Sequence, residues 1–166
     1  MIFSNLKRVI SKQYTLYLVL CTSYFFTSCD PNRVFEENKD IPKYIWISGD
    51  KKEFSIPISD TVSPHNIFIN VRNSDDYKFS NIYLFITTTF PDGKISKDTL
   101  ECILADDRGH WLGDGLGDIW DNQIPFKKNV RFPSKGNYTI ALEQAMRPDE
   151  IREIMDVGVR VEKQSK

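Results

Sequence analysis

The shortness and the alternation of the apolar runs after residue 43 constrain the fold most. In residues 66–72 (NIFINVR), Ile67, Ile69 and Val71 would point to one side of a strand, because successive side chains alternate between its faces. Short runs rich in Ile, Val, Phe, Tyr and Thr are typical of strands. We therefore expect strands over residues 44–47, 53–58, 66–72, 81–90, 98–105, 129–132, 138–144 and 157–162.

Turn-forming sequences separate these runs, for example PDGK at 91–94. About eight short strands with frequent turns predict an all-β protein, an antiparallel β-sandwich. Pro57 cannot donate a hydrogen bond to a ladder, so its strand is expected at an edge or a bulge. One short helix is expected near the C-terminus, over residues 147–155 (RPDEIREIM), where Pro148 suits the first helical position.

Residues 1–28 have the composition of an export signal. The segment carries Lys7, Arg8 and Lys12 before residue 14 and contains no acidic residue, and residues 14–26 (YTLYLVLCTSYFF) carry no charge. This apolar stretch is too short to span a bilayer. We therefore predict that residues 1–28 form a signal peptide.

The signal ends in the sequence FTSC, in which two small residues precede Cys29. This ending looks like the lipobox at which bacterial lipoproteins are acylated and cut, although Phe26 stands where leucine is usual. Cys21 is the rival acceptor, but it lacks the preceding small residue that cleavage needs. We predict lipidation at Cys29; the alternatives are an ordinary signal peptide beside an accidental cysteine and an uncleaved membrane anchor.

Cleavage before Cys29 would leave a polar tether over residues 29–42 and a β-sandwich domain over residues 43–163. The removed segment is basic, so the mature chain is more acidic than the full chain, whose net charge is −1. An acidic, well-mixed surface argues against nucleic acid as a partner. Cys102 would be the one remaining free thiol, so no internal disulfide is expected. The membrane would be reached through lipid alone, on the periplasmic face or at the outer membrane.

The segment GHWLGDGLGDIWDNQIP, residues 109–125, is the most distinctive part of the chain. Four of the eight glycines of the chain lie within its first nine residues, beside two of the three tryptophans. We expect a glycine-permitted loop, with its tryptophans packed on the sandwich as core anchors. The candidate interaction or packing surface consists of His110, Trp111, Asp114, Asp118, Trp120 and Asp121.

The same segment does not match the motifs of known metal-binding or dinucleotide-binding loops. Counted from Asp114 as an EF-hand loop, position 3 is Leu116 and position 6 is Ile119, where an oxygen ligand and a glycine are needed. Its glycines also lack the G-x-G-x-x-G spacing and the following helix of a dinucleotide loop. We therefore expect no metal site and no cofactor.

No catalytic residue is predicted. The chain has no G-x-S-x-G nucleophile motif, and Cys102 lies within an apolar strand, as a buried inert thiol would. His110 with Asp106 and Asp107 is read as a hydrogen-bonded loop rather than an acid–base pair. An enzyme is the least favoured class; a glycan-binding module, in which Trp111 or Trp120 stacks on sugar rings, is the main alternative.

Residues 79–163 resemble the gliding-motility lipoprotein GldH family of the Bacteroidetes. The matching pieces are NIYLFI (81–86), FPDG (90–93), DTLE (98–101), LADDRGHWLGDGLGDIWD (104–121), FP with G and Y (132–138), EQAMR (143–147) and DVGVRVE (156–162).

This resemblance implies an envelope lipoprotein needed for surface gliding, which works with other motility or envelope proteins and catalyses no reaction. Cys29 corresponds to the family's acylated cysteine. Relatives also occur in organisms that do not glide, so support of envelope biogenesis or of a secretion assembly is equally compatible.

Overall fold

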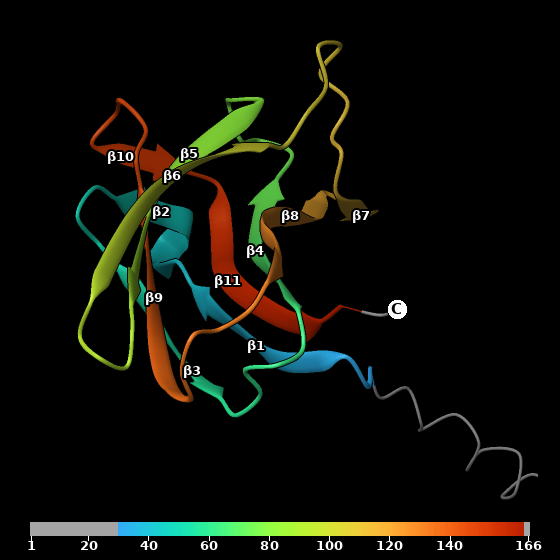
Figure 1. Ribbon diagram of the computed structural model, residues 1–166. Helices are drawn as coiled ribbons and strands as arrows, with labels where there is room; N and C mark the ends of the chain where they lie inside the picture. The colour runs from blue at the N-terminus through green and yellow to red at the C-terminus, as the bar shows by residue number, and fades with distance from the viewer. Residues whose placement is uncertain (1–29, 165–166) are drawn as a thin grey trace, which may run out of the picture. The chain divides into compact units, whose positions relative to one another are not determined.

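The computed structural model describes residues 30–164, which contain eleven strands and one short 3-10 turn (Figure 1). The described residues from 32 to 164 belong to one compact unit, which contains all of these elements. The elements are β1 (Arg33–Asp40), η2 (Pro42–Tyr44), β2 (Ile45–Ile47), β3 (Lys52–Ile58), β4 (His65–Ser74), β5 (Asn81–Thr89), β6 (Ile95–Ile103), β7 (Asp114–Leu116), β8 (Ile119–Val130), β9 (Gly136–Gln144), β10 (Glu150–Arg152) and β11 (Ile154–Lys163).

These strands form three antiparallel sheets. A five-stranded sheet has the order β1-β11-β4-β8-β7, and a four-stranded sheet has the order β3-β9-β5-β6. The short strands β2 and β10 pair as a third sheet, with Trp46 opposite Ile151. The expected all-β, antiparallel class is therefore confirmed.

The two larger sheets contribute to one hydrophobic core. In β4, every second residue from His65 to Asn73 is buried, and the residues between them are partly exposed. The β4 residues Ile67 and Ile69 belong to the same buried cluster as Leu84 of β5 and Ile140 of β9, which lie in the other sheet. The alternation in the sequence thus marks the inner faces of two sheets that share a core.

The predicted helix over residues 147–155 is wrong. Glu150–Arg152 forms β10, and Ile154 begins β11. Ile151 and Ile154 are both buried, but they are buried in separate strands, joined by Glu153 at a positive φ of 69°. Pairing of β10 with β2 overrides a local pattern that by itself suits a short helix.

β1 begins within the segment for which we expected a polar tether. Arg33–Asp40 pairs with β11 along most of its length, so these residues belong to the sheet. Its outer side chains are polar because the strand lies at a sheet edge and faces water, which concealed it in the sequence. The strand expected at 129–132 is also misplaced, since β8 begins at Ile119 and ends at Val130.

Two local expectations are confirmed. Pro57 lies in β3, which is an edge strand of the four-stranded sheet. Cys102 is fully buried, and burial raises the pKa of its thiol to about 12, so the thiolate is strongly disfavoured. Within residues 30–164, no helix has both the length and the apolar character that a membrane crossing requires.

His65 makes the stability of the domain sensitive to mild acid. Its side chain is fully buried, and neither ring nitrogen has a hydrogen-bond partner among the described residues. Burial lowers its pKa below the ordinary value of 6.5, while Asp60 opposes this effect and Lys163 adds to it. Below about pH 6.5 the unfolded chain therefore binds a proton that the folded chain resists, and the free energy of unfolding falls as the pH decreases.

We expect His65→Phe to reduce this dependence in urea melts compared between about pH 7.5 and about pH 5. The second histidine is the matched control, because His110 is exposed and its replacement removes no buried imidazole. His110→Gln should keep the pH dependence of the parent. An unchanged dependence in His65→Phe would assign the acid sensitivity to other groups.

Candidate functional site

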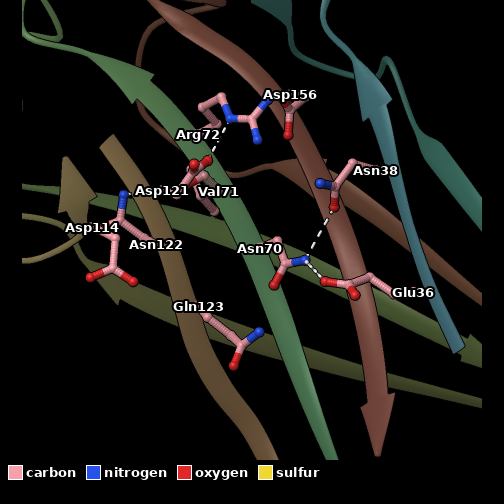
Figure 2. A pocket seen from close by; sticks show the side chains of 10 residues that line it. All are labelled: Glu36, Asn38, Asn70, Val71, Arg72, Asp114, Asp121, Asn122, Gln123 and Asp156. Carbon is pink, nitrogen blue, oxygen red and sulfur yellow. Dashed lines mark hydrogen bonds and ion pairs between the residues drawn. The ribbon is translucent and has the colours of Figure 1, made fainter. Parts of the chain in front are cut away.

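A polar cleft lies on the outer face of the five-stranded sheet, and we call it the outer-face cleft (Figure 2). Its volume is about 310 Å³. All five strands of the sheet contribute to its lining, which consists of Glu36, Asn38, Asn70, Val71, Arg72, Asp114, Asp121, Asn122, Gln123 and Asp156. The polar side chains that alternate with buried residues in β4 therefore meet polar side chains of the other four strands on this face.

One row of charged side chains crosses the cleft because the strand register aligns them. Asp156, Arg72, Asp121 and Asp114 occupy successive paired positions in β11, β4, β8 and β7. The Arg72 guanidinium contacts Asp156 through Nη1 at 3.0 Å and donates a hydrogen bond to Asp121 through Nε at 2.5 Å. The positive charge of Arg72 therefore offsets part of the negative charge of its two neighbours in the row, Asp156 and Asp121.

The surroundings of Asp156 and Arg72 shift the pKa values of these two groups. Burial raises the pKa of Asp156, and the nearby positive charge of Arg72 opposes this rise. The hydrogen bond to Asp121 raises the pKa of Arg72, which therefore remains charged. Figure 2 draws no interaction from the Asp114 carboxylate to the other residues of the cleft. Asp114 is thus the exposed anionic end of the row.

A second row carries amides. Asn38, Gly158, Asn70 and Gln123 are aligned across β1, β11, β4 and β8. The Asn70 amide donates to Asn38 Oδ1 at 3.1 Å and to Glu36 Oε1 at 3.4 Å, as the dashed lines of Figure 2 mark. Asn70 Oδ1 is buried and has no hydrogen-bond partner among the described residues. An unpaired buried acceptor is costly, so this oxygen is an unfavourable feature of the amide row.

Gly158 is required at the centre of the amide row. A Cβ at this position would lie 1.7 Å from Asn38 Oδ1 and 2.7 Å from the Glu37 carbonyl oxygen. The missing side chain lets Asn38 lie across β11 and reach Asn70. Gly158, the glycine in the sequence DVGVRVE, therefore lets the Asn38 side chain and the Glu37 backbone approach β11 closely.

We expect Gly158→Ala to lower the free energy of unfolding by about 1–3 kcal/mol, because the added methyl group displaces Asn38 and presses on β1. Urea denaturation followed by circular dichroism measures this loss. Adding Asn38→Ala should recover only part of it, because the clash with the Glu37 carbonyl remains. If Gly158→Ala has the same free energy of unfolding as the parent, β1 moves away from the added methyl group without cost, which contradicts the prediction.

The structure brings only two of the predicted surface residues into the cleft, Asp114 and Asp121. Trp120 is half-buried and packs against Gly115, where a Cβ would lie 2.5 Å from the indole ring. Its Nε1 donates a hydrogen bond to Asp75. Trp120 is therefore not a core anchor, and it does not line the cleft.

Trp111 fits the packing prediction better. It is half-buried and packs against the margin of the core, and it forms an isolated bridge with Ala105. The fully buried tryptophan is Trp46, which the sequence analysis did not single out. The core anchor is thus in a different part of the chain from the glycine-rich segment.

His110 and Asp118 lie in connecting turns. The carboxylate of Asp106 accepts hydrogen bonds from the backbone N–H groups of Arg108 and His110 at 2.8 Å, and it lies 3.1 Å from His110 Nδ1. The exposed positions and the backbone contacts match a hydrogen-bonded loop. Asp118 is exposed in the β7–β8 turn, and its carbonyl oxygen accepts from the Asp75 N–H at 2.9 Å.

The glycine-rich segment is a hairpin rather than the expected loop. β7 pairs with the start of β8, with Leu116 opposite Ile119. Asn122 secures the base of this hairpin, because its buried amide donates to the Val71 carbonyl at 3.1 Å and to Asn73 Oδ1 at 3.0 Å. Gly113 is needed beside it, since a Cβ there would lie 2.8 Å from Asn122 Oδ1.

Sequence reasoning missed most of the cleft residues, including Asn70, Arg72 and Asp156. Asn70 and Asp156 each lie between two apolar residues of a strand, and Arg72 follows one, which is the one local signal of their location. Their convergence depends on the pairing of strands far apart in the chain. Cys29, the predicted lipidation site, lies outside the described residues.

The described residues show no grouping of three His, Cys, Asp or Glu side chains that could hold a metal ion. The cleft therefore offers hydrogen-bond acceptors, amide donors and one paired guanidinium. Four of its lining side chains are carboxylic acids, and one is a guanidinium. This arrangement suits the binding of polar groups that donate hydrogen bonds.

Comparison with known proteins gives matches along nearly the whole domain. The family model described as GldH lipoprotein matches residues 33–161. A protein named gliding motility lipoprotein GldH homolog, from Christiangramia forsetii, is 35% identical over 157 residues, covering 90% of this chain and 96% of its own length. The gliding motility lipoprotein GldH of Flavobacterium johnsoniae is 32% identical over 152 residues, covering 87% of this chain and 94% of its own length.

Among solved structures, a carbohydrate-binding module specific for non-crystalline cellulose aligns with a TM-score of 0.39 and 9% identity. The alignment covers 77% of this chain and 70% of that one. At this TM-score the likeness carries no argument about ligand or function.

Proposed function

The chain belongs to the GldH lipoprotein family, and from this premise we propose that it is a lipid-anchored, non-catalytic component of a motility or envelope assembly. The observation that carries the proposal is the family match over residues 33–161, which includes every strand of the unit except the last residues of β11. The two named relatives are matched over almost their full lengths, so the similarity extends to the N-terminal region.

The proposed anchor is Cys29. An export signal ending in two small residues before a cysteine is the arrangement that lipoprotein processing requires. The two or three acyl chains of a processed lipoprotein hold a domain firmly at a membrane, whereas one chain holds it marginally. We expect the domain to lie on the periplasmic face of the envelope or at the outer membrane.

We propose that the outer-face cleft is the surface at which another envelope or motility protein docks. Carboxylates outnumber guanidinium groups in its lining. A partner that inserts lysine or arginine side chains would complement this surplus of negative groups. The Asp114 carboxylate is exposed, and Figure 2 draws no ion pair to it, so it is an anionic group open to such a contact.

Photocrosslinking in living cells tests this docking surface. A photoreactive amino acid at Gln123, in the cleft, should give a discrete product with an envelope protein. The same amino acid at Val62, which is 80% exposed and lies outside the cleft, should give none. Equal crosslinking at both positions, or none at either, would contradict a docking role.

We expect Asp114→Lys to reduce the Gln123 product about tenfold, because it reverses the charge at the open end of the cleft. Asp118→Lys is the matched control, since Asp118 is equally exposed but lies in the β7–β8 turn outside the cleft. The control should leave the product unchanged. Equal effects of both variants would indicate a general charge effect rather than a specific contact.

Glycan binding is the second candidate, favoured by the partial exposure of Trp111 and Trp120. Against it, neither indole lines the cleft, so the polar groups and the aromatic rings do not form one sugar-binding surface. Polysaccharide binding that disappears in Trp111→Ala or Trp120→Ala would support this alternative. Retention of binding in both variants would exclude stacking on these rings.

A further inference from the structure

β6 presents an unpaired edge to solvent. It is the last strand of the four-stranded sheet, and among the described strands only β5 pairs with it. The side chains at alternate positions from Ile95 to Ile103 are exposed, and Ile95 and Ile103 are 62% and 49% exposed. Two exposed isoleucines at the ends of a nine-residue edge strand are a feature that proteins usually avoid.

The exposed side chains of β6 read, in order, Ile95, Lys97, Thr99, Glu101 and Ile103. This order is complementary to itself when reversed. In an antiparallel pair centred on Thr99, each isoleucine meets an isoleucine, each Lys97 meets a Glu101 and Thr99 meets its own copy. Directly opposed residues of antiparallel strands interact, and opposite charges or apolar pairs stabilise them.

We propose that two copies of this chain associate through their β6 edges, antiparallel and centred on Thr99. The contact is isologous, because the same residues act on both sides of a twofold axis. It joins the two four-stranded sheets into one continuous sheet and pairs the free backbone groups of both edges.

The ends of β6 limit the contact to the symmetric stretch. Beyond Ile103 the edge is already occupied, because the Leu104 carbonyl accepts a hydrogen bond from the Leu112 N–H at 2.8 Å. Before Ile95 the chain turns, and the Phe90 N–H donates to the Lys94 carbonyl at 2.8 Å. The free edge therefore runs from residue 95 to 103, and Thr99 is its midpoint.

Neighbouring residues hold β6 in place and border its free edge with exposed aromatic side chains. On the inner side, the Asp98 carboxylate accepts a hydrogen bond from Lys127 Nζ at 2.8 Å, which ties β6 to the opposite sheet. On the outer side, Tyr83 and Phe85 of β5 are exposed beside Glu101 and Thr99. The edge is thus held in place and bordered by exposed aromatic surface.

Lys97 also favours pairing of β6 with a second copy of the chain over pairing with other strands. A charged residue on an edge strand normally prevents pairing, because few partner strands can neutralise it. In the self-paired register, Glu101 of the second copy lies directly opposite, so the charge favours this one partner. The same register gives two such Lys–Glu pairs, one on each side of the axis.

Disulfide formation in native membranes tests the contact with the full-length chain. Thr99→Cys places one thiol opposite its own copy, and opposed Cα atoms of antiparallel strands are close enough for a disulfide. We expect a dimer on a non-reducing gel after mild oxidation. Ser55→Cys is the matched control: Ser55 is exposed in β3, the opposite edge of the same sheet, and should give no dimer. Cys102 is buried and should not contribute.

Charge reversal distinguishes a disulfide formed in the proposed register from one formed by random collision of two chains. In the Thr99→Cys chain, Lys97→Glu places like charges opposite each other at both pairs and should reduce the dimer about tenfold. Adding Glu101→Lys reverses the charge of the other member of each pair, so opposite charges again face each other and the dimer should be restored. Circular dichroism of each variant confirms that the exposed changes leave the fold intact.

Three results of the crosslinking experiments would overturn the proposal, as would a different protein in the crosslinked band. They are the absence of a dimer from Thr99→Cys, an equal dimer from Ser55→Cys, and a charge reversal that has no effect. Co-purification of two differently tagged copies identifies the partner in the crosslinked band, and a band that contains a different protein would assign the edge to that protein instead.

Discussion

Replacing Trp46 with alanine is expected to lower the free energy of unfolding by about 3–5 kcal/mol. Trp46 is fully buried, and its Nε1 donates a hydrogen bond to the Asp50 carbonyl oxygen at 2.8 Å. The truncation leaves a cavity and also leaves that carbonyl without its donor. A loss of this size is a large part of the stability of a typical domain. Urea denaturation followed by circular dichroism measures it.

The two half-buried tryptophans are the controls for this prediction. Trp120 packs against Gly115 outside the core cluster, so Trp120→Ala should cost about 1 kcal/mol. Trp111 packs against the core margin, so Trp111→Ala should have an intermediate effect. An effect of Trp120→Ala as large as that of Trp46→Ala would contradict the assignment of Trp46 as the central anchor.

Cys29→Ala is expected to release the protein from the membrane. Removing the acceptor removes every acyl chain attached there, and each buried methylene of such chains contributes about 0.8 kcal/mol to membrane binding. Metabolic labelling with a fatty-acid probe should mark the parent protein and leave Cys29→Ala unmarked. Fractionation should then find the parent in the membrane pellet and the variant in the soluble fraction.

The other cysteines are the controls for the anchor. Cys21 lies within the predicted signal peptide, and Cys102 is buried in β6. Cys21→Ala and Cys102→Ala should both keep the label and the membrane association. Label that persists in Cys29→Ala but disappears in Cys21→Ala would move the lipid to Cys21. Membrane association without any label would favour an uncleaved anchor.

Local pattern predicted most of the strands. The alternation of Ile67, Ile69 and Val71 identified the buried side of β4, and Pro57 predicted an edge or a bulge for β3, which lies at an edge. These features follow from the twofold period of a strand and from the missing N–H of proline, so they need no knowledge of distant residues.

Local pattern failed where pairing outweighs propensity. Residues 147–155 have a proline and an apolar spacing that suit a helix, but β10 pairs with β2 and buries Ile151 against Trp46. β1 is polar on its outer face and was therefore read as a tether. In both cases the strand exists because a distant strand supplies its hydrogen bonds.

The candidate site was predictable only in small part. Asp114 and Asp121 stand close together in a distinctive segment, and both reach the cleft. Asn70, Arg72 and Asp156 are single polar residues in ordinary strands, and their positions in the sequence carry no sign that they meet. The register of β11, β4 and β8 brings them together.

Neighbouring residues were enough to predict the all-β class, an export signal that ends at a cysteine and the family to which the chain belongs, because composition, period and motif are local properties. Long-range strand pairing was needed to place Trp46 in the core, to form the lining of the cleft and to leave β6 with a free edge. Those features arise from the order and register of strands, which depend on contacts between residues far apart in the chain.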